Sequence, residues 1–78
     1  MELKILKKLF QEGLLLTAKA LPAPMYSGQY ILVFSKSNGG EEQVTRARDG
    51  ETKIYKRWNG AVLDAQEVGF KEVTIRFE

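Results

Sequence analysis

Apolar and polar residues follow two periods along this chain, and each change of period marks a predicted element. In residues 2–12 the apolar side chains share one arc of a helical wheel and the charged ones the other, and Gly13 follows where a helix can end. This pattern predicts an amphipathic helix that covers the domain's own sheet. The alternative is a helix that binds a membrane surface or a partner, but its few lysines are balanced by two glutamates.

The next two segments read as strands. Residues 14–21 alternate in polarity, which favours a strand over a continued helix, and two prolines follow. Residues 29–35 are apolar on both faces and rich in β-branched and aromatic side chains, which predicts a central strand covered on each side. A helix can cover one face, whereas the second requires another element or a second subunit. The candidate interface residues for a protein partner or homodimer are Tyr30, Leu32 and Phe34.

Two glycine-containing turns predict hairpins in the middle of the chain. Residues 37–40 read as the first turn, and residues 42–48 as the strand that follows it. Asp49-Gly50 is typical of a type I′ turn, from which residues 51–55 return as another strand. The middle of the chain is therefore expected to form an antiparallel meander.

The last third of the chain combines a helical pattern with an alternating one. Its helical face consists of Trp58, Ala61, Val62, Ala65 and Val68. This spacing predicts a helix that begins near Arg57, tolerates Gly60 and stops at Gly69, although Asn59 could instead be the N-cap. Residues 72–77 alternate with Val73, Ile75 and Phe77 on one face, which predicts a closing strand packed against that helix.

The element order is therefore α-β-β-β-β-α-β. We expect an α+β fold, a two-layer sandwich in which two helices cover an antiparallel meander sheet of four to five strands. The length of 78 residues corresponds to a single domain over residues 1–78.

Composition argues against catalysis. The chain has no histidine and no cysteine, so it lacks the usual general base, the thiolate nucleophile and the common zinc ligands. Asp64 and Glu67 lie three residues apart on the predicted helix and are expected to share its solvent face. We therefore predict no enzyme, no catalytic residues, no metal site and no small-molecule cofactor. The apolar runs are too short to span a membrane, so we expect no membrane partner. A small secreted domain usually needs disulfides, so the absence of cysteine favours the cytoplasm or a partner subunit.

Positive charge is concentrated in residues 45–57. This segment holds five cationic and two acidic side chains, a net charge of +3, whereas the whole chain carries +2. A two-stranded ribbon with such charge fits the major groove of DNA. The candidate nucleic-acid contacts are Arg46, Arg48, Lys53, Tyr55 and Arg57. The alternative is a solvated sheet face whose cations protect an edge from aggregation.

Several runs of the sequence resemble small accessory proteins of plasmids and integrating conjugative elements that are associated with partition or replication. These runs are residues 28–34, Gln43–Gly50, Ile54–Trp58, 63–65 and Gly69–Ile75. The resemblance implies a mobile-element origin, a role beside DNA or a DNA-handling protein, and no catalytic residues. Two hypotheses follow: an accessory protein that binds nucleic acid through the basic hairpin, and a non-catalytic interaction module without nucleic-acid contact.

Overall fold

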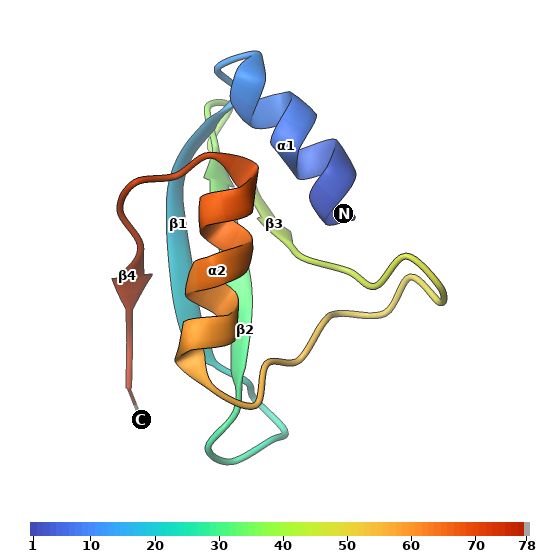
Figure 1. Ribbon diagram of the computed structural model, residues 1–78, viewed down its shortest axis with the longest axis vertical. Coiled ribbons are helices and arrows are strands. Elements are labelled where there is room, and N and C mark those ends of the chain that lie inside the picture. Colours follow the sequence, from blue (N-terminus) through green and yellow to red (C-terminus); the bar gives the residue numbers. More distant parts are fainter. Residues whose placement is uncertain (78) are drawn as a thin grey trace.

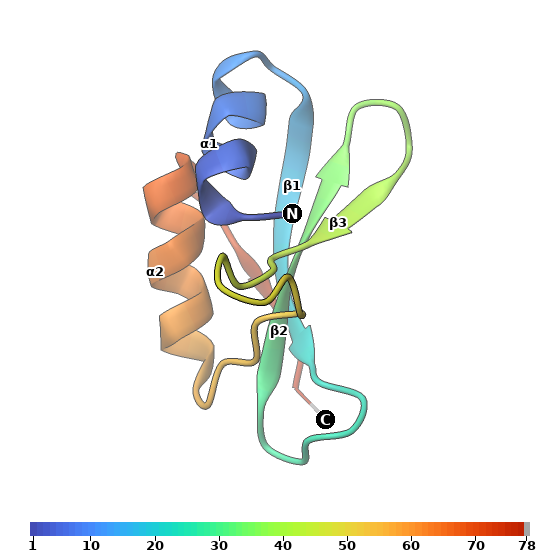
Figure 2. The same ribbon diagram turned by 90° about the vertical axis from the view of Figure 1, so that its right-hand side faces the viewer.

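Both helices form where the 3.6-residue pattern predicts them, and both lie on the same face of the sheet (Figures 1 and 2). In the computed structural model, which describes residues 1–77, α1 spans Leu3–Gln11 and α2 spans Trp58–Val68. Arg57 is the N-cap of α2 and Gly60 lies inside the helix, which confirms the favoured helix start. Gly69 ends α2 with φ of 133°, a conformation that side chains other than glycine rarely adopt.

The sheet has four strands, and it is mixed rather than antiparallel. The strands are β1 (Leu15–Pro22), β2 (Tyr30–Lys36), β3 (Glu41–Gln43) and β4 (Thr74–Ile75). Their order is β3-β2-β1-β4. β2 runs antiparallel to both of its neighbours, whereas β4 runs parallel to β1. The α+β class with two helices is confirmed, and the predicted meander is wrong, because α2 carries the chain across the helix-covered face to the opposite edge of the sheet.

The predicted basic hairpin forms only in part: its two arms pair through a single antiparallel bridge, Thr45 to Thr52, with two backbone hydrogen bonds of 2.8 Å, and not as extended strands. β3 ends at Gln43, and the Val44 N–H still donates to the Leu32 carbonyl of β2. Beyond Val44, the segment of residues 44–57, here called the basic connection, leaves the sheet and returns to β2 at an isolated bridge from Tyr55 to Tyr30. No residue other than glycine has a positive φ within residues 1–77, so Asp49-Gly50 does not form a type I′ turn. The Asp49 carboxylate instead accepts hydrogen bonds from the Glu51 backbone N–H and the Arg46 side chain, which favours a local loop over a ladder.

The main core lies between the helices and the sheet. Its largest fully buried side chains are Phe34, Leu6, Leu32 and Val44. Small residues on both layers, such as Ala20 in β1 and Ala65 in α2, bring the helix close to the sheet. Phe70 stacks on Phe34 with ring centroids 5.3 Å apart and contacts the Phe10 ring at 4.8 Å, which joins both helices to the sheet.

The second face of β2 is covered within the same chain. Ile31 and Val33 are buried in a separate small cluster with Ala23, against which the partly buried Leu21 and Ile54 pack. This face needs no second subunit to remove it from water.

The prediction of an interface on β2 is therefore corrected. Leu32 and Phe34 have no exposed surface because both helices cover them, and only Tyr30 is partly exposed. Two more expectations fail at the end of the molecule where α2 begins. Trp58 is 44% exposed because it is the first residue of α2, and Phe77 is 63% exposed, whereas Val73 and Ile75 are half-buried as predicted.

Candidate nucleic-acid interface

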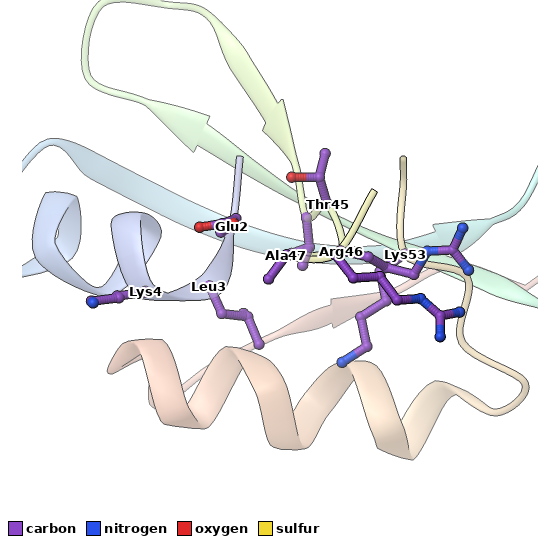
Figure 3. A pocket seen from close by; sticks show the side chains of 9 residues that line it. Glu2, Leu3, Lys4, Thr45, Arg46, Ala47 and Lys53 are labelled. Atoms are coloured by element: carbon purple, nitrogen blue, oxygen red, sulfur yellow. The ribbon is translucent and has the colours of Figure 1, made fainter. Parts of the chain in front are cut away.

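The basic connection does not gather its five predicted contact residues on one surface. Arg46, Arg48 and Lys53 line a hollow of about 440 Å³ between this connection and the start of α1 (Figure 3). Arg57 lines a different hollow, and Tyr55 is buried with 5% of its surface exposed. Tyr55 is therefore corrected from a contact residue to a core residue.

Internal ion pairs compensate two of the cations that line the first hollow, Arg46 and Lys53. Arg46 Nη2 lies 2.6 Å from Asp49 Oδ2 and 3.3 Å from Glu51 Oε2, and Lys53 Nζ lies 2.8 Å from Asp64 Oδ2. The pKa of Asp49 lies below its usual value, mainly because the Glu51 backbone N–H donates to its carboxylate and also because Arg46 does so. Arg46 and Lys53 are thus paired with carboxylates, whereas Lys4 and Arg48 of the same lining are exposed and make no ion pair within residues 1–77.

Tyr55, Lys53 and Asp64 form a compact polar cluster between the basic connection and α2. A single carboxylate oxygen, Asp64 Oδ2, accepts hydrogen bonds from the Tyr55 hydroxyl at 2.6 Å and from Lys53 Nζ at 2.8 Å. Lys53 Nζ also lies 5.1 Å from the centre of the Tyr55 ring. The Asp64 side chain is only 17% exposed, so the expectation that it shares the solvent face of α2 with Glu67 is wrong. This cluster anchors the connection to the helix.

A second hollow of about 380 Å³ combines cations with aromatic rings at the start of α2. Its lining consists of Gly28, Tyr30, Lys56, Arg57, Trp58 and Asn59, here called the aromatic–basic hollow. Lys56 and Arg57 are exposed, and neither makes an ion pair with any residue of the described range 1–77. Among the described residues 1–77, no acidic residue belongs to this lining. The Phe77 ring meets the Tyr30 ring edge-on at a centroid distance of 6.4 Å, which extends the aromatic surface.

Two residues of this hollow were missed by reasoning from the sequence. The spacing of Trp58 from Ala61 predicts a place on the buried helix face, and Lys56 alternates with the predicted contact residues Tyr55 and Arg57. The signal that could have found them is the run Lys56-Arg57-Trp58, two cations directly before an aromatic residue at a helix start.

Within residues 1–77, no group of three or more acidic, histidine or cysteine side chains is arranged to hold a metal ion. None of the helices in this range is both long enough and apolar enough to span a membrane. Comparison with known protein families, curated proteins and solved structures found no match to this chain. The expected role beside DNA in a mobile element therefore stays a prediction.

Proposed function

We propose that this protein binds single-stranded nucleic acid at the aromatic–basic hollow. The observation that carries the proposal is the position of two exposed cations, Lys56 and Arg57, directly beside the exposed ring of Trp58; neither cation makes an ion pair within residues 1–77. Proteins that bind single strands without sequence preference combine these same elements, cations for the phosphates and aromatic rings for the bases.

In this proposal each side chain has a distinct role. The Trp58 ring stacks on a base, and Tyr30 offers a second ring in the same hollow. Lys56 and Arg57 contact phosphates and release their counterions, which makes the affinity depend on salt. A ribbon that reads the major groove would need a regular hairpin, and the single bridge between Thr45 and Thr52 does not provide one. This favours a single strand over a duplex.

The test is a fluorescence anisotropy titration with a labelled single strand of about 20 nucleotides and the matching duplex, at several salt concentrations from about 50 to 200 mM. We expect tighter binding of the single strand. Trp58→Ala is expected to weaken it by about 5- to 150-fold, because one stacking contact contributes about 1–3 kcal/mol. Because Trp58 is the only tryptophan of the chain, its own fluorescence should also be quenched by the bound strand in the unmodified protein.

Variants that remove positive charge distinguish binding at this hollow from a general attraction between the nucleic acid and the cations of the protein surface. The double variant Lys56→Ala with Arg57→Ala is expected to reduce the slope of log affinity against log salt by about 1.4, the value for two phosphate contacts. Lys7→Ala with Lys8→Ala removes the same charge from exposed positions of α1, and Arg48→Ala tests the tip of the basic connection. The proposal is wrong if no binding occurs at about 50 mM salt. It is also wrong if the Lys7 and Lys8 substitutions weaken binding as much as the Lys56 and Arg57 substitutions do.

A further inference from the structure

In the part of the chain that the structure describes, residues 1–77, no strand pairs with the outer edge of β4. On its inner side β4 pairs with β1, where Thr74 lies opposite Lys19 and the Arg76 N–H donates to the Ala20 carbonyl at 2.9 Å. Successive residues of an extended strand direct their backbone groups to opposite edges. The N–H and C=O groups of Val73 and Ile75 therefore face outward, away from β1.

The other edge of the sheet is partly closed. The Met1 amino group donates to the Gln43 carbonyl at 2.9 Å, and the Thr45 N–H donates to the Met1 carbonyl at 2.9 Å. Met1 thus lies alongside Val44, just beyond β3, in the manner of a parallel strand partner. Within residues 1–77, β4 is consequently the edge that is available to a strand from another chain.

Side chains around β4 divide into two kinds. Glu72, Thr74 and Arg76 share the parity that faces away from the helices, and all three are exposed. Val73 and Ile75 are half-buried on the helix-covered side. The exposed series thus reads acidic, neutral, cationic, with Thr74 at its centre.

We propose that β4 pairs antiparallel with β4 of a second copy of this chain, about a two-fold axis at Thr74. In this register Glu72 lies opposite the partner's Arg76, and Arg76 lies opposite the partner's Glu72, so each dimer gains two cross-strand ion pairs. Val73 lies opposite the partner's Ile75. Because both residues direct their backbone groups outward, they exchange hydrogen bonds and extend the two sheets into one.

Charge complementarity selects this register. An axis at Val73 would place Glu72 opposite the partner's Thr74, and an axis at Ile75 would place Arg76 opposite the partner's Thr74, so neither forms these ion pairs. The paired segment is short, and the area it buries is expected to be smaller than the roughly 1,200–2,000 Å² of a stable interface. The dimer is therefore weak, and this inference does not depend on nucleic-acid binding.

Sedimentation equilibrium of the full chain, up to about 1 mM, tests the proposal at a concentration suited to a small interface. The wild type is expected to dimerise reversibly. Glu72→Arg and Arg76→Glu each place like charges opposite one another at both pairs, and each is expected to raise the dissociation constant by about 10- to 100-fold. The double variant with both charges exchanged restores the ion pairs and is expected to recover the dimer.

Glu67→Arg is the matched control, because it makes the same change of charge at an exposed position of α2. It should leave the dissociation constant within about threefold of the wild type. Far-UV circular dichroism shows whether each variant is folded. The proposal is overturned if the wild type stays monomeric throughout, if the single variants dimerise as the wild type does, or if the double variant remains as weak as the single ones.

Discussion

Replacing Gly69 by alanine is expected to lower the free energy of unfolding by about 2–4 kcal/mol. Two effects add at this position. Its φ of 133° is one that a residue with a Cβ rarely adopts. A Cβ there would also lie 2.5 Å from Cε1 and 2.6 Å from Cδ1 of Phe10, inside van der Waals contact. Phe10 cannot move freely because its ring packs on Phe70, so the close contact is expected to push α1 away from α2.

Urea unfolding followed by Trp58 fluorescence measures this loss. Gly13→Ala is the matched control, since Gly13 also has a positive φ, 76°, but no atom within 4 Å of the added Cβ. The Gly13→Ala substitution should lower the free energy of unfolding by only about 1 kcal/mol, because it has the conformational cost of a positive φ without the close contact. Combining Gly69→Ala with Phe10→Leu is expected to cost less than the sum of the two single changes, because the smaller side chain relieves the clash. Equal losses for the Gly69 and Gly13 variants would contradict the steric explanation.

Tyr55→Phe is expected to lower the free energy of unfolding by about 1.5–3 kcal/mol at neutral pH, the range for a hydrogen bond to a charged group. The change removes the hydroxyl that donates to Asp64 at 2.6 Å and leaves a mostly buried carboxylate with Lys53 as its remaining side-chain partner. Tyr26→Phe is the control, because Tyr26 is half exposed and makes no side-chain hydrogen bond within the described residues.

The same hydroxyl should make the fold sensitive to alkaline pH. Burial first, and then the hydrogen bond and the charge of Asp64, raise the pKa of Tyr55 well above its usual value. In the unfolded chain the Tyr55 hydroxyl loses its proton near pH 10, whereas in the folded protein the hydroxyl stays protonated at this pH. The contribution of the Tyr55 hydroxyl to the free energy of unfolding is therefore complete below about pH 10. It falls by about 1.4 kcal/mol per pH unit as the pH rises further.

Unfolding free energies of the wild type and of Tyr55→Phe, measured between about pH 8 and 11.5, check this dependence. The difference between the two proteins is expected to shrink above about pH 10 as the wild type loses its advantage. Tyr26→Phe should parallel the wild type over the whole range. A constant difference between wild type and Tyr55→Phe would mean that Tyr55 ionises equally in both states.

The local elements of this protein were readable from its sequence, because short-range chemistry decides them. The helix over residues 58–68 and its stop at Gly69 follow from apolar spacing and from a glycine that accepts a positive φ. β1 and β2 follow from alternation and from a run of β-branched and aromatic residues.

The tertiary structure decided the strand partners, the contacts of Asp64 and the candidate site. The alternation of polar and apolar residues does not reveal that residues 45–57 leave the sheet. Arg46, Asp49 and Glu51 form local hydrogen bonds with one another, and a segment with such bonds has the same polar pattern in its sequence as a strand of a ladder. Helical spacing predicts Trp58 on the buried face, but as the first residue of α2 it is 44% exposed. The packing of distant segments therefore turned a predicted core residue into the centre of the candidate nucleic-acid interface.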